Sequence, residues 1–98
     1  MAYKVAPEKR VLKYLKKLKE KKLKEQFINV IYNDIAKNPD KGIQKQGNLS
    51  EIYIWELRYD KTDYRIAYII EEKNIVPILL VGSHENFYRE LKRITRYR

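Results

Sequence analysis

In the N-terminal part of the chain, hydrophobic residues recur every three to four positions, which predicts two helices. A short segment at 2–5 is expected to form a strand before them. The first helix is predicted over 7–19, and Pro7 suits its first turn. The second is predicted from about Leu23 and should end near Pro39, because the residue before a proline is disfavoured in a helix. Two helices joined so closely form an antiparallel hairpin with one apolar seam.

In the C-terminal half the hydrophobic period changes to two, which predicts β-strands. After the first of them, a turn at 59–63 leads to a second strand at 64–70. A nearly continuous apolar run at 75–81 predicts a third strand in the sheet interior, where Pro77 indicates a bulge or an edge. The last predicted element is an amphipathic, basic helix over 85–97.

These elements predict one α+β domain over 1–98, made of a strand, a helical hairpin, a three-stranded antiparallel meander and a C-terminal helix. A polar loop at 42–50 connects the hairpin to the meander. One face of the meander is aromatic and has to be covered, and the hairpin is the only sizeable apolar partner available. That face is formed by Tyr53, Trp55, Leu57, Tyr64, Ile66 and Tyr68.

The chain is strongly basic, with 22 Lys and Arg against 13 Asp and Glu, a net charge of +9 and a pI near 9.7. Much of this charge lies on the hairpin, because residues 4–25 hold ten Lys or Arg and three Glu. Such an excess indicates a polyanionic partner, most simply nucleic acid. A solvated lysine-rich surface and an acidic protein partner are the alternatives. Interspersed acids and the lack of an aromatic insertion face argue against a membrane-surface role.

The residue types that are absent narrow the possible chemistry. The sequence has no cysteine and one histidine, so we expect no disulfide, no metal site and no cofactor. There is no apolar run near 18 residues, and the N-terminus lacks the apolar core of a signal peptide. We therefore expect a soluble protein of the cytoplasm, with no membrane partner.

Charged residues on the first two strands of the meander suggest an anion site. If the strands pair Tyr59 with Tyr64, then Arg58 lies opposite Arg65, with Glu56 as a diagonal neighbour on the same face. Like charges facing each other are unfavourable unless an anion binds between them. This pairing therefore predicts a phosphate site on the sheet face away from the hairpin.

The only histidine follows the third strand, where the apolar run stops at a glycine. Ser83 is a plausible N-cap for the last helix, with Asn86 as a weak capping-box partner. If the helix starts near Ser83, then His84 and Tyr88 lie one turn apart and face the same space. His84 would then be well placed for proton transfer near neutral pH, although a lone histidine is also commonly a structural residue.

Three motifs together resemble the RelE/ParE superfamily of type II toxins. They are Trp-Glu-Leu-Arg at 55–58, Tyr-Arg-Ile-Ala-Tyr at 64–68 and Gly-Ser-His-Glu-Asn-Phe-Tyr at 82–88, and their order and spacing fit nearly the whole chain. Members with a histidine after the last strand are similar to the ribosome-dependent mRNA interferases. The resemblance implies a toxin that cuts mRNA in the ribosomal A site, a cognate antitoxin and operator DNA as a candidate partner of their complex.

The resemblance also implies roles for individual residues. Arg65 would hold the scissile phosphate, His84 would protonate the leaving 5′ oxygen, and Tyr88 would stack on or position the nucleotide. Glu56 departs from the lysine of the best-known members and would be either the base for the 2′-hydroxyl or a counter-ion of the arginines. Attack by the 2′ oxygen needs no metal and yields a 2′,3′-cyclic phosphate and a 5′-hydroxyl. Further RNA-binding candidates are Arg58, Lys45 and Arg89.

Two other activities stay open at this level. One is a non-enzymatic toxin of the same fold that poisons DNA gyrase. The other is an RNA-binding module in which arginines hold phosphates and tyrosines stack on bases without cleavage.

Overall fold

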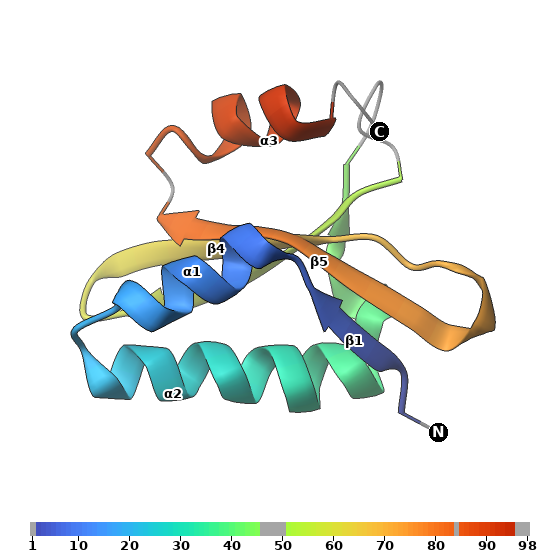
Figure 1. The fold of residues 1–98 in the computed structure, drawn as a ribbon, viewed down its shortest axis with the longest axis horizontal. Helices are drawn as coiled ribbons and strands as arrows, with labels where there is room; N and C mark the ends of the chain where they lie inside the picture. The colour runs from blue at the N-terminus through green and yellow to red at the C-terminus, as the bar shows by residue number, and fades with distance from the viewer. Residues whose placement is uncertain (1, 46–50, 84, 96–98) are drawn as a thin grey trace.

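A five-stranded sheet forms the centre of the protein (Figure 1). The computed structural model describes residues 2–45, 51–83 and 85–95. The strands are β1 (Lys4–Pro7), β2 (Ile43–Gln44), β3 (Tyr53–Tyr59), β4 (Thr62–Tyr68) and β5 (Ile75–Ser83). They lie in the order β1-β5-β4-β3-β2, with β1 parallel to β5 and the other neighbours antiparallel.

Helices cover both faces of this sheet (Figure 1). On one face lie α1 (Lys9–Lys17) and α2 (Lys21–Asn29), and the second continues as a π-helical stretch over Val30–Ile35. On the other face lies α3 (Phe87–Thr95). The predicted α+β class, the helical hairpin, the meander β3-β4-β5 and the C-terminal helix are therefore confirmed.

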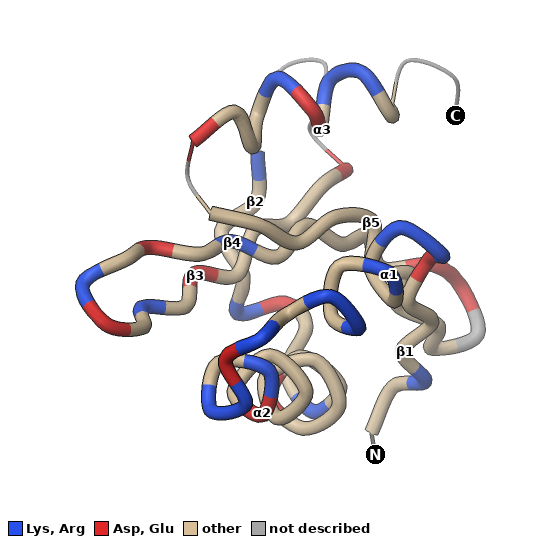
Figure 2. The backbone as a smooth tube through the Cα atoms, turned by 60° about the vertical axis from the view of Figure 1, so that its left-hand side comes forward, with Lys and Arg blue, Asp and Glu red and all other residues tan. Residues whose placement is uncertain are grey.

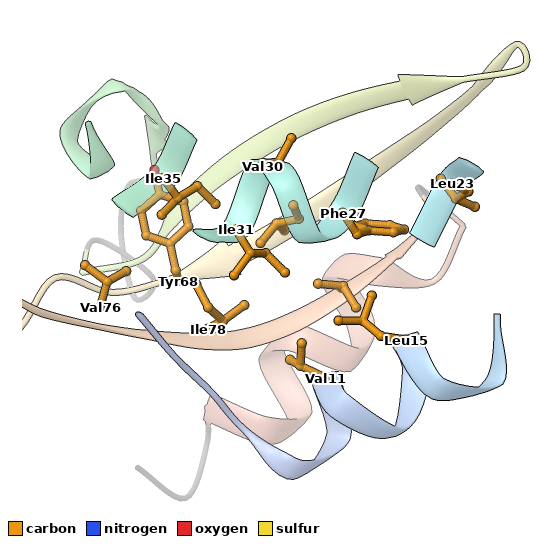
Figure 3. Close-up of a cluster of buried hydrophobic side chains, with 12 residues drawn as sticks. Val11, Leu15, Leu23, Phe27, Val30, Ile31, Ile35, Tyr68, Val76 and Ile78 are labelled. Atoms are coloured by element: carbon orange, nitrogen blue, oxygen red, sulfur yellow. The ribbon is translucent and has the colours of Figure 1, made fainter. Parts of the chain in front are cut away.

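The larger core lies between the helical hairpin and the sheet (Figure 3). Phe27 of α2 is fully buried and packs edge to face against Tyr14 and Tyr64, with ring centroids 6.0 and 5.6 Å apart. All six residues of the predicted aromatic face belong to this core or pack against it. The apolar seam read from the helical periodicity is therefore confirmed.

A second, smaller core lies between the sheet and α3. Phe87 and Leu91 of the helix are buried there against Ile54 and Ala67 of the sheet. Because side chains alternate along a strand, residues such as Arg65 lie on this second face, between neighbours that point into the larger core. The fold thus places the charged residues of β3 and β4 on the same side of the sheet as α3.

The predicted pairing of β3 with β4 is wrong by two residues on one strand. Tyr59 pairs with Thr62, and the connecting turn consists of Asp60 and Lys61, whose φ angles are 47° and 67°. Two positive φ values define a tight hairpin turn that is usually built with glycine or asparagine. The sequence at this turn contains neither, so the composition gave no sign of so short a connection.

The N-terminal and edge strands also differ from the prediction. β1 begins at Lys4 and includes Pro7, because its parallel pairing with β5 runs from Lys4 opposite Ile75 to Pro7 opposite Ile78. The first helix consequently begins at Lys9. β2 was predicted as loop, since two residues are too few for a periodic pattern.

Pro77 lies close to a bulge, as predicted, but its strand is not at an edge. The register between β4 and β5 shifts near Tyr68, which pairs with Ile78, while Ala67 pairs with Leu80. β5 lies between β1 and β4, and the Pro77 carbonyl accepts a hydrogen bond from the Ile69 amide at 3.2 Å. The missing N–H of proline is therefore accommodated inside the sheet.

Candidate functional site

Arg65 is the centre of the polar group on the α3 side of the sheet. It lies in β4, where its backbone pairs with Glu56 of β3 on one side and with Gly82 of β5 on the other. Its side chain is only 14% exposed, which is unusual for an arginine. Three strands and α3 thus hold this guanidinium in one place.

The guanidinium is only partly satisfied by its neighbours. Nη2 lies 3.1 Å from Oε2 of Glu56, and Nε donates a hydrogen bond to the Tyr88 hydroxyl at 3.2 Å. Nη1 is buried and has no hydrogen-bond partner among the described residues. A buried donor without a partner costs about 1–3 kcal/mol. The planar, forked donors of arginine match the oxygens of a phosphate, so this site is suited to an anion.

Tyr88 contacts two cations at once. The Lys45 ammonium lies 4.4 Å from the centre of its ring, and the Arg65 guanidinium carbon lies 5.7 Å from it. Both distances are within the range of a cation–π interaction. Phe87 packs edge to face against the same ring at 5.4 Å. Phe87 is thus both a buried residue of the smaller core and a support for the Tyr88 ring.

Lys45 reaches this position because the backbone beyond β2 is fixed. Its amide donates a hydrogen bond to the Ile52 carbonyl at 2.8 Å, which extends the pairing of β2 with β3 by one residue. The side chain can therefore be placed beside the Tyr88 ring. Of the predicted site residues, the structure brings together Arg65, Glu56, Tyr88 and Lys45, here called the Arg65 cluster.

Two predicted RNA-binding residues lie outside the Arg65 cluster. Arg58 is opposite Asp63, 3.7 Å from its carboxylate, and its side chain is 70% exposed. The predicted like-charge pair of Arg58 with Arg65 is therefore wrong, because the tight turn moves Glu56 opposite Arg65. Arg89 is exposed on α3 and forms no hydrogen bond or ion pair with a described residue.

The predicted helix start at Ser83 is also wrong. Ser83 is the last residue of β5, and α3 begins at Phe87. Between them, Asn86 has a φ of 62°, and its carbonyl accepts a hydrogen bond from the Glu90 amide at 3.1 Å. The helix therefore does not extend back to Ser83, and the predicted placement of His84 beside Tyr88 falls on a residue outside the described ones.

In the described ranges, no group of three or more His, Cys, Asp or Glu side chains is arranged to hold a metal ion. No helix in those ranges has the length and apolar character needed to cross a membrane.

A family model of the ParE-like toxins of type II bacterial toxin–antitoxin systems matches residues 5–92. No curated protein matches the chain significantly. A mutant of the Escherichia coli toxin RelE in the free state is 25% identical, with 98% of each chain covered and a TM-score of 0.75. A chain of the toxin–antitoxin complex RelBE2 from Mycobacterium tuberculosis is 22% identical, with 86% of this chain and 100% of that chain covered and a TM-score of 0.69.

Proposed function

This chain belongs to the ParE-like toxins of type II bacterial toxin–antitoxin systems, and we propose that it is an endoribonuclease that cuts mRNA on the ribosome. The observation that carries this proposal is the buried, unpartnered Nη1 of Arg65, held beside a carboxylate and a phenol. A cation that keeps a donor in reserve suits a phosphate that gains negative charge during reaction. The similarity to RelE structures supports the choice of RNA as the substrate.

The Arg65 cluster contains groups for three parts of the reaction. Glu56 accepts the proton of the 2′-hydroxyl, and its carboxylate is 53% exposed and thus accessible to substrate. The 2′ oxygen then attacks the adjacent phosphorus, and the bond from phosphorus to the 5′ oxygen breaks. Arg65 stabilises the negative charge on the non-bridging oxygens, and Lys45 adds a second cation beside Tyr88. The products are a 2′,3′-cyclic phosphate and a 5′-hydroxyl.

Protonation of the leaving oxygen needs an acid near the same phosphate. His84 is the proposed donor, since histidine exchanges protons near neutral pH. Tyr88 positions the nucleotide, and its hydroxyl is already fixed by the Arg65 Nε. Each general acid or base contributes about 10²–10⁴-fold to such a reaction.

The partners follow from the toxin class. The related RelBE2 structure contains a toxin–antitoxin complex, so an antitoxin is the expected inhibitor of this chain. We further propose that the complex binds operator DNA and that the free toxin acts in the cytoplasm on ribosome-bound mRNA. The basic net charge of +9 supports a nucleic-acid target.

Primer extension on a defined mRNA paused in ribosomes tests this function. We expect the wild type to cut in the A-site codon and Arg65→Ala to cut roughly 10²–10³-fold more slowly, the loss typical for removing one transition-state donor. Arg58→Ala is the matched control, because it removes the same charge from the same sheet face without touching the Arg65 cluster. An exposed ion pair contributes about 0–1 kcal/mol, so the control should lose less than about fivefold.

Two further variants separate the roles of the other groups. Glu56→Gln should slow cleavage if the carboxylate is the base, whereas cleavage at the parent rate would make it only a counter-ion of Arg65. If His84→Ala cuts mRNA at the rate of the wild type, His84 is not the general acid. Intact mRNA in every lane, with the wild type folded and ribosomes occupied, would contradict the nuclease proposal as a whole.

The match to ParE-like toxins supports one alternative, a toxin that poisons DNA gyrase without cutting RNA. In that case the purified protein would leave ribosome-bound mRNA intact and trap gyrase on cleaved DNA. Relaxation and cleavage assays with gyrase, run on the same preparations, distinguish the two activities. An Arg65→Ala variant that still poisons gyrase would further separate the Arg65 cluster from that activity.

A further inference from the structure

Nearly all of the net charge of this protein lies in one short segment. Residues 9–24 contain nine Lys or Arg and one Glu, a net of +8, whereas the whole chain has a net charge of +9. The remaining residues are therefore almost neutral overall. The segment comprises α1, the connection and the start of α2, and blue segments gather there in Figure 2.

Five lysines at the turn of this hairpin, here called the lysine turn, are all exposed. None of them forms an ion pair with a carboxylate of the described residues. The one acid among them, Glu20, lies 3.4 Å from the Tyr59 hydroxyl, which donates a hydrogen bond to it. The lysine turn consists of Lys16, Lys17, Lys19, Lys21 and Lys22.

Two of these lysines stand where helix electrostatics disfavours them. Lys21 and Lys22 occupy the first turn of α2, which contains no acidic residue, although Glu20 places one carboxylate at the N-cap before it. The N-terminus of a helix carries a partial positive charge, so carboxylates stabilise it and cations destabilise it. This arrangement lowers stability, and binding of a polyanion at the turn would offset the repulsion.

The lysine turn is separate from the Arg65 cluster. The hairpin packs on the face of the sheet formed by residues such as Tyr64 and Ile66, while Arg65, between them in β4, lies on the opposite face beside Tyr88. Figure 1 shows the sheet between α2 and α3. A single nucleotide cannot contact both surfaces, so the lysine turn is a second surface.

We propose that the lysine turn binds the phosphate backbone of structured RNA and anchors the protein while the Arg65 cluster engages a separate strand. Exposed lysines without interleaved apolar anchors suit a polyanionic backbone, whose binding is dominated by charge. Protein interfaces instead centre on apolar and aromatic residues. Within 9–24 the only large apolar side chain that is exposed is Leu12, at 49%.

Fluorescence anisotropy with a labelled RNA duplex of about 20 base pairs tests this surface, at salt concentrations from about 50 to 200 mM. The test variant replaces Lys16, Lys17, Lys21 and Lys22 with Gln, which has a similar helix propensity. The matched control replaces four exposed lysines elsewhere, so both variants lose the same charge; these are Lys4, Lys37, Lys41 and Lys61.

We expect the test variant to bind the duplex at least roughly tenfold more weakly, with the slope of log K against log salt reduced by about 3, close to 0.9 for each lost phosphate contact. The control should keep most of the affinity and the slope. Equal losses in both variants would mean that net charge alone drives binding and would overturn the proposal.

A second variant guards against loss of folding. Lys21→Glu with Lys22→Glu places carboxylates in the first turn of α2, so the Tm should rise while duplex binding falls. Binding that stays at the wild-type level in this stabilised variant would contradict the proposal. Polyglutamate that competes as strongly as the RNA duplex would reassign the surface to an acidic protein, and a DNA duplex in parallel shows whether RNA is preferred.

Arg65→Ala distinguishes this proposal from the proposed nuclease activity. Its duplex binding should match that of the wild type, because the Arg65 cluster lies on the other face of the sheet. If no cleavage is found with any variant but the test variant still loses duplex binding, the lysine turn stands and the nuclease proposal fails. If Arg65→Ala loses as much duplex binding as the test variant, the second surface does not exist.

Discussion

At the scale of single residues, Glu56 both orients Arg65 and competes for it. Its carboxylate already holds Nη2, while Nη1 is unpaired but buried, so a phosphate can reach Nη1 only when the side chains around it shift. Binding at Nη1 need not break the ion pair, which allows the base and the phosphate to be held by one cation. Glu56→Gln would keep the shape of this contact but remove its charge. The variant therefore separates the role of Glu56 as a base from its role in orienting Arg65.

Tyr68 provides a test of stability that is independent of catalysis. Its ring is fully buried, and its hydroxyl donates a hydrogen bond to the Pro39 carbonyl at 2.5 Å. A Cβ at position 42 would overlap this hydroxyl, which explains why Gly42 is a glycine. The tyrosine thus ties β4, the middle strand of the sheet, to the short 3-10 helix Pro39–Lys41 that follows the helical hairpin.

Burial raises the pKa of Tyr68 well above its ordinary value of 10.0. Above that pH the unfolded chain loses the phenolic proton while the folded protein keeps it, so the free energy of unfolding should fall as pH rises. Tyr68→Phe should weaken this pH dependence and cost about 0.5–1.5 kcal/mol at neutral pH. Urea unfolding at about pH 7.5 and pH 11 checks both effects.

Some pH dependence should remain in Tyr68→Phe, because burial also raises the pKa of Tyr14. A variant that unfolds with the wild-type pH dependence would show that Tyr68 does not carry the effect. Tyr32→Phe is a suitable control, since Tyr32 is 46% exposed on the helical hairpin.

At the scale of elements, the turn between β3 and β4 decides which charges meet. With Asp60 and Lys61 both at positive φ, the hairpin has two connecting residues and Glu56 faces Arg65. A longer turn would have placed Arg58 there. The geometry of the Arg65 cluster therefore depends on a turn that lies at the far end of the hairpin.

Lys61→Gly should stabilise the protein by up to about 1 kcal/mol, because glycine adopts φ near 67° without the steric cost borne by lysine. Thermal unfolding measures the change. Lys41→Gly, in a region of ordinary φ, is the control and should not stabilise. A lower Tm for Lys61→Gly would indicate that the entropy of the unfolded chain outweighs the relief of strain.

Hydrophobic periodicity is sufficient to find helices and strands but not their bounds. Alternation predicted the second meander strand at 64–70, whereas β4 is Thr62–Tyr68. It also identified the face covered by the hairpin, and the helical spacing identified the hairpin itself. Periodicity could not give the register, because a register depends on the turn, and it could not find a two-residue strand such as β2. The prediction for Arg58 failed for the first of these reasons.

The same limit applies to the site. The motifs named Arg65, Glu56 and Tyr88, and the structure brings them together. Lys45 was predicted only as an RNA-binding candidate, since no local pattern tells which way the side chain of a loop lysine points. The pairing of its amide with the Ile52 carbonyl places it beside Tyr88. Long-range pairing, and not local sequence, determines that contact.

At the scale of the whole molecule, the sheet separates two cores of unequal size. Among the described residues, the core under the helical hairpin contains twelve buried residues and the core under α3 contains six, so less apolar contact holds α3 to the sheet. We expect α3 amides to exchange hydrogen faster than those of α2, as measured by NMR at neutral pH. Equal protection of both helices would contradict this difference.

The parallel pairing of β1 with β5 has a consequence for the synthesis of the toxin. Lys4 lies opposite Ile75, so the first strand finds its partner only after the chain has been made to about residue 78. Closing so long a loop is slow compared with forming the local hairpins. Tyr88 comes later still, so the Arg65 cluster can form only after residue 88 has been made. A ribosome making this protein is thus not exposed to a finished toxin while the nascent chain is still short.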